Sequence, residues 1–228
     1  MNVLAFDTCL TACSAALICG EAAPLTSFAR MERGQSEALF PMVAGLMRAS
    51  GLAFADLDRI AVTRGPGSFT GVRAGIAAAR GFALAYGAPV VTATSLEVMA
   101  WQCVKGFGEA ERRSGFLIAH DARRGELYVQ LFDGAGRAMS DAALATPEQA
   151  AMLAREAGVA AGGAAALVAA EAERLGFAVT PRFPEMLPEA IDLAELALTR
   201  APDGHPPSPL YLRPPDAKPQ TDKALARA

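Results

Sequence analysis

Hydrophobic positions near the start of the chain change from a strand pattern to a helical pattern. Two short apolar runs, residues 3–8 and 12–19, flank residues 9–11, which predicts a β-hairpin, and residues 26–30 are typical of a third strand. Between residues 36 and 50 the apolar positions instead recur at helical spacing. We therefore expect a three-stranded meander followed by a helix.

The next segments alternate between strand and helix. Residues 59–63 indicate a buried strand, residues 71–86 a helix and residues 89–93 another strand. Thr94 and Glu97 have the spacing of a capping box for a helix that runs to about residue 104. This succession predicts parallel strand pairing and an α/β fold.

The second half of the chain begins again with strands. Residues 116–121 and 126–133 flank a predicted turn at residues 122–125, and Thr146 with Pro147 marks the start of a helix over residues 147–157. Weaker patterns predict a strand near residues 158–163 and two alanine-rich helices, at 164–175 and 187–200.

A polar segment at residues 105–114 contains glycine and indicates a boundary between two lobes. We predict one lobe over residues 1–104, a second over residues 105–213, and a mobile, proline-containing tail over residues 214–228.

Composition narrows the class of protein. The chain has 228 residues, 52% of them hydrophobic, and a net charge of -3, which favours a folded protein and disfavours one that holds RNA by itself. The beginning of the chain has no export pattern and no apolar run is long enough for a membrane helix, so we expect a cytoplasmic protein. The four cysteines lack CxxC spacing and are expected to be small buried residues.

A glycine-rich loop joins a predicted strand to a predicted helix at residues 64–73. Because a helix N-terminus offers free N–H groups, this loop could bind an anion. The spacing matches neither the P-loop nor the Rossmann fingerprint, and a tight turn with close helix packing is the favoured interpretation. The candidate anion-binding residues are Gly65, Gly67, Ser68, Thr70 and Gly71.

The helices predicted at residues 36–50 and 71–86 have more small or apolar residues than one buried side of a helix needs. Small residues three or four positions apart permit close helix approach, either to the protein's own sheet or to another chain. The candidate partner-binding residues are Leu39, Met42, Val43, Leu46, Gly71, Ala74, Gly75, Ala78 and Phe82.

Residues with catalytic chemistry are sparse. Asp7, at the end of the first strand, could hold a metal-bound water or a phosphate, but one carboxylate is not a site. With only His120 and His205 in the chain, neither a metal cluster nor a Ser/His/Asp set is assembled. We therefore assign no catalytic residue, no metal and no cofactor.

Five segments, taken in order, closely resemble the bacterial TsaB (YeaZ) family of tRNA threonylcarbamoyladenosine biosynthesis proteins. They are VLAFDT at residues 3–8, QSEALFPM at 35–42, GPGSFTGVR at 65–73, HDARRGELY at 120–128 and PLYLR at 209–213. The GPGSFTG and DARRGELY segments carry most of the specificity. Gln35 stands where the family commonly has histidine, which weakens a metal site at that helix entrance.

The resemblance implies two ribonuclease H-like lobes of the actin and sugar kinase superfamily, the second reduced. It also implies a noncatalytic partner of a TsaD-type transferase, which works with a TsaE-type ATPase to modify the adenosine next to the tRNA anticodon. The protein would pair with itself when alone and would meet tRNA only through the complex.

Two other functions stay open at this stage. A small ATP-dependent kinase or transferase would use Asp7 and a turn at Gly162-Gly163 near an adenine, and it would bind Mg-ATP. A glycopeptidase-like hydrolase would need a metal or a nucleophile that the sequence does not supply.

Overall fold

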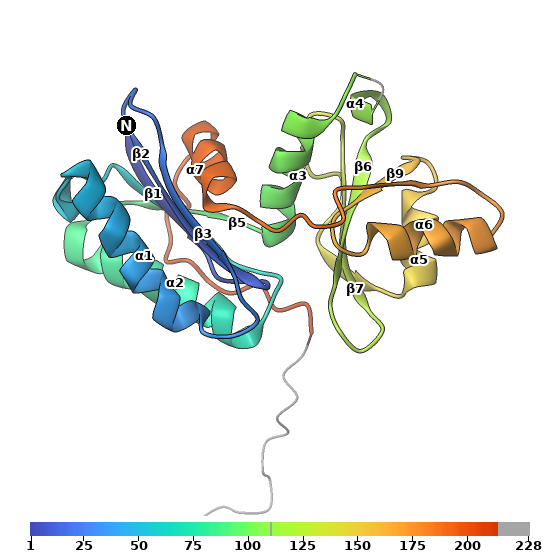
Figure 1. Cartoon of the computed structure of the whole chain (residues 1–228), viewed down its shortest axis with the longest axis horizontal. Helices are drawn as coiled ribbons and strands as arrows, with labels where there is room; N and C mark the ends of the chain where they lie inside the picture. The colour runs from blue at the N-terminus through green and yellow to red at the C-terminus, as the bar shows by residue number, and fades with distance from the viewer. Residues whose placement is uncertain (110, 214–228) are drawn as a thin grey trace, which may run out of the picture.

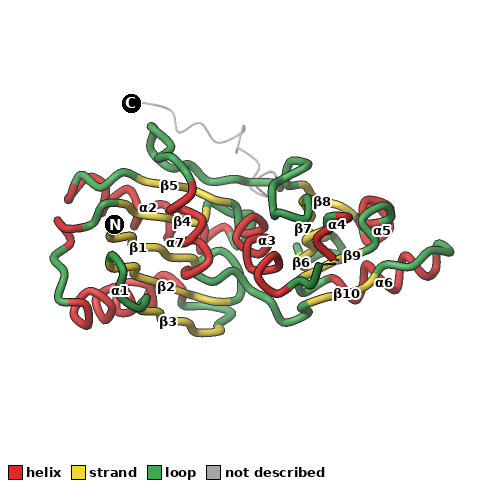
Figure 2. The backbone as a smooth tube through the Cα atoms, turned by 90° about the horizontal axis from the view of Figure 1, so that it is seen from above, coloured by secondary structure: helices red, strands yellow, loops and turns green. Residues whose placement is uncertain are grey.

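The computed structural model describes residues 1–109 and 111–213, which form two α/β lobes (Figure 1). Each lobe is built on a five-stranded sheet. A view from above places the two sheets side by side along the long axis of the molecule, with helix α3 between them (Figure 2). Among the described residues, no helix is long and apolar enough to cross a membrane.

The first sheet combines a meander with two parallel strands. Its strands follow the order β3-β2-β1-β4-β5. The first three pair antiparallel, whereas β1, β4 and β5 run parallel, which confirms the predicted βαβ pairing. The strands are β1 (Asn2–Asp7), β2 (Ala12–Cys19), β3 (Leu25–Arg30), β4 (Arg59–Thr63) and β5 (Val90–Ala93).

Helices cover both faces of this sheet because its strands are apolar on both sides. Leu4 and Phe6 belong to the core cluster that includes helices α1 (Gln35–Ser50) and α2 (Phe69–Tyr86). Val3 and Ala5 point to the opposite face, where α3 (Ser95–Gly106) and α7 (Ala190–Thr199) pack. Figure 1 shows α1 and α2 lying together on one side of the sheet and α7 on the other.

The second sheet repeats the plan of the first. Its order is β10-β9-β6-β7-β8, with β6, β7 and β8 antiparallel and β6, β9 and β10 parallel. Three of its strands have only three residues, so this lobe is reduced. The strands are β6 (Phe116–Asp121), β7 (Leu127–Phe132), β8 (Ala143–Ala145), β9 (Val159–Ala161) and β10 (Thr180–Arg182).

The helices of the second lobe lie on its outer face. Leu117 and Ala119 of β6 pack there against α5 (Pro147–Ala154) and α6 (Ala165–Arg174), while Ile118 points inward to the main core. Two folded lobes with this repeated strand order confirm the predicted ribonuclease H-like, actin-like α/β class.

The helix-capping signals predicted from the sequence are confirmed. Thr94 and Thr146 each form the predicted capping box, with Glu97 and Gln149 respectively. Short elements escaped prediction because three or four residues show no periodicity. These elements are η1 (Phe54–Asp56), α4 (Glu111–Ser114), β8 and β10.

The C-terminal segment returns to the first lobe. Helix α7 buries Leu193 and Leu196 against the first sheet, although both lie in the stretch 105–213 predicted as one lobe. The packing of α7 therefore differs from that division, because its apolar side completes the face that α3 leaves uncovered. The boundary near residue 104 stays a prediction, and the predicted tail, residues 214–228, lies outside the described residues.

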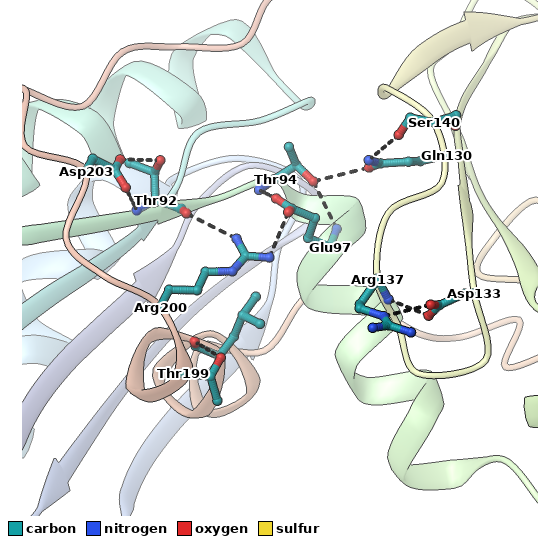
Figure 3. Close-up of polar contacts among 11 residues, drawn as sticks. Thr92, Thr94, Glu97, Gln130, Asp133, Arg137, Ser140, Thr199, Arg200 and Asp203 are labelled. Atoms are coloured by element: carbon teal, nitrogen blue, oxygen red, sulfur yellow. Dashed lines mark hydrogen bonds and ion pairs between the residues drawn. The ribbon is translucent and has the colours of Figure 1, made fainter.

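Polar contacts hold the C-terminal segment in this position (Figure 3). Asp203 Oδ2 accepts a hydrogen bond of 2.6 Å from the Thr92 hydroxyl of β5. Arg200 forms an ion pair of 2.7 Å with Glu97, at the start of α3. Thr94, which caps α3, also lies 3.4 Å from the side-chain oxygen of Gln130 on β7, so α3 connects both lobes.

Candidate functional site

The loop between β4 and α2 lies directly on the β1–β2 hairpin. The Ser68 amide donates a 2.7 Å hydrogen bond to the Cys9 carbonyl oxygen, and the Thr8 hydroxyl donates a 2.6 Å hydrogen bond to the Gly71 carbonyl oxygen. The Ser68 hydroxyl accepts from the Gly71 amide and caps α2. Hydrogen bonds to Thr8 and Cys9 thus hold the loop against the β1–β2 hairpin.

The glycines of this loop permit the close approach. A Cβ at Gly67 would overlap with the carbonyl oxygen of Cys9, and a Cβ at Gly71 would overlap with that of Thr8. At Gly75 a Cβ would lie 2.8 Å from the Thr8 hydroxyl oxygen. Contact with the protein's own hairpin therefore accounts for these glycines, as the favoured interpretation of the loop expects.

Other segments approach the loop from its remaining sides. Ser95, at the start of α3, donates from its amide to the Gly65 carbonyl and from its hydroxyl to the Pro66 carbonyl, at 2.9 and 3.0 Å. The Leu210 amide donates to the Arg64 carbonyl at 2.7 Å. The Tyr128 hydroxyl of the second lobe lies 3.5 Å from the Gly67 carbonyl oxygen. Both lobes and the C-terminal segment therefore meet at this loop.

Anion binding by the glycine-rich loop at residues 64–73 stays a prediction. Ser68 and Thr70 are exposed, as an anion contact requires, whereas Gly65 and Gly71 are buried and Gly67 is half-buried. Two backbone donors of the site, the Ser68 and Gly71 amides, already bond to protein oxygens. The loop thus offers fewer N–H groups than its sequence indicates.

Asp7 is fully buried below the same loop. One of its carboxylate oxygens accepts a hydrogen bond from the Thr63 hydroxyl, and the other accepts from the Cys9 amide at 3.3 Å. Burial raises the pKa of this carboxyl to about 6, and the hydrogen bonds from Thr63 and Cys9 oppose the increase. Both carboxylate oxygens of Asp7 therefore accept hydrogen bonds from donors within the protein.

Three of the four cysteines lie in the interior, as expected, whereas Cys19 and His120 are half-buried. Cys9, Cys13 and Cys103 are buried, and burial raises the pKa of each thiol, that of Cys13 to about 12. Such thiols are poor nucleophiles. His120 lies one residue before the end of β6, and burial lowers its pKa. Among the described residues, no three His, Cys, Asp or Glu side chains are grouped to hold a metal ion.

Gln35 ties the entrance of α1 to the hairpin below it. Its side-chain amide donates to the carbonyl oxygens of Leu10 and Met31, at 3.1 and 3.0 Å. Both donor hydrogens of the amide group are thereby used within the protein. At this position Gln35 has a structural role.

The Gly162-Gly163 turn is closely packed. A Cβ at Gly162 would lie 2.6 Å from the Ala119 carbonyl oxygen, and a Cβ at Gly163 would lie 3.2 Å from His120 Nδ1. The Gly162 amide donates to the Arg182 carbonyl at 3.1 Å. These contacts account for both glycines without a bound adenine.

The predicted partner-binding residues divide into two groups. Met42, Ala74 and Phe82 are half-buried and reach the surface. The others are buried in the protein's own core, which uses them for packing α1 and α2 on the sheet. These buried residues are Leu39, Val43, Leu46, Gly71, Gly75 and Ala78.

The solvent side of α1 and α2 carries apolar residues that the sequence analysis did not select. Leu84 is 90% exposed and Phe40 is 55% exposed, and a Cβ at Gly45 or Gly81 would meet open space. Counting positions from the buried residues around each helix would have found them, because they lie outside the buried stripe of each helix. We call Phe40, Gly45, Ala77, Gly81 and Leu84 the outer α1–α2 surface.

An aromatic cluster borders this surface. The rings of Phe54 and Phe82 stack with centroids 5.3 Å apart, and Phe54 also stacks on Tyr86 at 5.2 Å. Phe40 contacts Phe82 with centroids 5.9 Å apart, so the cluster joins α1 to α2. Tyr86 is 44% exposed, and the cluster therefore extends the apolar area of the surface.

Comparison with known sequences finds relatives over parts or all of the chain. The family described as TsaD, tRNA N6-adenosine threonylcarbamoyltransferase, matches residues 29–189. The tRNA threonylcarbamoyladenosine biosynthesis protein TsaB of Escherichia coli K12 is 38% identical over 128 residues, 56% of this chain and 53% of that protein. The chain thus aligns with about half the length of this relative.

Two further relatives cover almost the whole chain. An uncharacterized protein of Mycobacterium tuberculosis H37Rv is 33% identical over 229 residues, which cover 96% of this chain and 94% of that protein. The solved structure of YeaZ from Pseudomonas aeruginosa is 30% identical with a TM-score of 0.76, and covers 92% of this chain and 99% of the other. The similarity to YeaZ therefore extends over both lobes.

Proposed function

This chain belongs to the TsaB (YeaZ) family, and from that premise we propose that it acts in tRNA threonylcarbamoyladenosine biosynthesis as a noncatalytic partner of a TsaD-type transferase. Full-length similarity to YeaZ is the observation that carries this proposal. In this function the protein works in the cytoplasm with the transferase and a TsaE-type ATPase, and it meets tRNA through the complex.

The packing around the glycine-rich loop supports a noncatalytic role. Asp7, which the kinase alternative requires for Mg-ATP, has both carboxylate oxygens in hydrogen bonds with Thr63 and Cys9. The space beside Gly67 and Gly71 is filled by the hairpin. Calorimetry with Mg-ATP tests this point: micromolar affinity that Asp7→Asn abolishes would favour the kinase alternative.

We place the transferase contact on the outer α1–α2 surface. Its small residues, Gly45, Ala77 and Gly81, allow another helix to approach to about 8 Å, and Phe40 and Leu84 supply exposed apolar area. A free molecule would cover the same area by forming a two-fold homodimer.

Depletion of the protein tests the function, and matched variants test the surface. Depleted cells should lose threonylcarbamoyladenosine from their tRNA. Leu84→Asp should remove co-purification with the transferase, whereas Leu167→Asp, which changes a 49% exposed leucine on α6, should not. Normal threonylcarbamoyladenosine after depletion, without a second gene copy, would overturn the function. Equal binding by both variants would overturn only the surface.

A further inference from the structure

An arginine at the start of α2 lies against two exposed aromatic rings. The guanidinium carbon of Arg73 is 3.5 Å from the centroid of the Phe69 ring and 5.8 Å from that of Tyr211. Its Nε donates a 2.8 Å hydrogen bond to the Tyr211 hydroxyl. Phe69 and Tyr211 stack with centroids 5.2 Å apart and remain 48% and 42% exposed. A cation and two partly exposed aromatic rings are therefore held in one place.

The two stretches of sequence that carry Arg73 and Tyr211 contain no acidic residue. No aspartate or glutamate occurs between residues 59 and 96 or between residues 204 and 213. Arg80 lies two turns after Arg73 on α2 and donates to the Pro207 carbonyl at 2.9 Å. Among the ion pairs of the described residues, none includes Arg64, Arg73 or Arg80. These two stretches therefore carry a net positive charge, although the whole chain is acidic, and Glu126, the acidic residue that reaches the second stretch, is paired with Arg213.

Single-stranded RNA matches this combination of groups. Unpaired bases stack on aromatic rings and on guanidinium planes, and arginine binds phosphate with a planar pair of donors. A duplex keeps its bases stacked inside and leaves the exposed rings without a partner. An acidic protein would use the arginines but would not need two exposed rings beside them.

We propose that Phe69, Arg73 and Tyr211, which we call the Arg73 face and which lie at the N-terminal end of α2 before the outer α1–α2 surface begins, contact single-stranded RNA. The inference rests on the proposed function for the identity of that RNA, a segment of the tRNA substrate. Binding by the chain alone is weak, because a few phosphate contacts supply little counterion release. Within the complex, the Arg73 face adds to contacts made by the partner.

The second lobe offers a control with the same chemistry. Arg155 lies 5.3 Å from the centroid of the Phe177 ring, as an exposed arginine on an aromatic side chain. Glu156 follows it directly in the sequence, so its surroundings lack the excess of positive charge. Arg155→Gln therefore removes the same charge and the same type of contact at another place.

The experiment measures binding of a short, fluorescently labelled uridine-rich RNA to the full chain at low salt. Arg73→Gln should weaken binding at least threefold and reduce the salt dependence by about one phosphate contact. Phe69→Leu should weaken binding with the salt dependence unchanged, because it removes a stacking surface and no charge. Arg155→Gln should bind as the wild type does. Melting curves establish that each variant is folded.

Crosslinking of 4-thiouridine-labelled RNA locates the contact independently. Crosslinks are expected in peptides that cover residues 65–73 or 201–213. Crosslinks elsewhere, equal affinity of Arg73→Gln and Arg155→Gln, or preference for a duplex would overturn the inference. So would an Arg73→Gln variant that loses only protein partners, which indicates an acidic protein as the ligand. The proposed function would survive each of these results if depletion still lowers threonylcarbamoyladenosine.

Discussion

At the scale of single residues, two glycines of the same helix have opposite environments. A Cβ at Gly71 would overlap with the Thr8 carbonyl oxygen and lie 2.7 Å from the Ser68 hydroxyl, whereas a Cβ at Gly81 would meet open space. Gly71→Ala should therefore lower the free energy of unfolding by about 1–3 kcal/mol through overpacking. Gly81→Ala should raise it by up to about 1 kcal/mol through helix propensity. Urea unfolding of both variants checks this, and changes of the same sign would contradict the packing described for α2.

Burial of the Asp7 carboxyl makes stability depend on pH in an unusual direction. Its folded-state pKa of about 6 lies above the ordinary value of 3.8, so the folded state holds the proton more tightly. This group contributes its full stability below pH 3.8 and loses it as the pH rises toward 6. Asp7→Asn removes the titration. The wild type should therefore lose about 3 kcal/mol relative to Asp7→Asn between pH 3 and 7.

Unfolding of the wild type and Asp7→Asn by urea at several pH values measures that difference. The comparison between the two proteins cancels the contributions of the exposed carboxyl groups, which are the same in both. A difference that does not change with pH would show that Asp7 has an ordinary pKa and contacts water.

At the scale of elements, neighbouring alanines on α2 separate folding from association. Ala78 is 6% exposed within the core cluster, while Ala77 is exposed on the outer α1–α2 surface. Ala78→Arg should unfold the protein, because it places an unpaired charge in the core at a cost of several kcal/mol. Ala77→Arg should leave the fold intact and prevent self-association. Circular dichroism with sedimentation measures both properties, and a folded monomeric Ala78→Arg variant would reverse the assignment of the two sides.

At the scale of the whole molecule, α7 connects the end of the chain to the first sheet. Its buried leucines, Leu193 and Leu196, lie with Val3 and Ala5 in one cluster. Each contributes about 1.5–3 kcal/mol of burial, so removing the helix should take a large part of a typical stability of 5–15 kcal/mol. A chain that ends at residue 188 should therefore fail to fold.

A chain that ends at Arg213 is the matched control for this truncation. It keeps α7, the hydrogen bond from the Leu210 amide to the Arg64 carbonyl oxygen, and the 2.5 Å ion pair between Arg213 and Glu126. Thermal melts followed by circular dichroism compare the two chains. Similar melting temperatures of the two chains would mean that the first sheet is stable without α7.

The sequence by itself determined the class of fold and the beginning and end of most long elements. Apolar periodicity is a local property, as are the capping boxes of Thr94 and Thr146, and both act over a few residues. The same holds for the glycine-rich loop, whose residue types exclude a P-loop. These features depend on residues that are close in sequence and not on contacts with distant parts of the chain.

Only the tertiary structure decided which side of each element is buried and against what. Leu39 and Phe40 are adjacent in sequence, yet one is 1% and the other 55% exposed, because consecutive residues of α1 point about 100° apart and only Leu39 faces the sheet. Gly71 faces the hairpin and Gly81 faces solvent for the same reason. The return of α7 to the first sheet and the meeting of Tyr211 with Arg73 join residues more than 100 positions apart. Such contacts depend on how the lobes assemble, which no short stretch of sequence specifies.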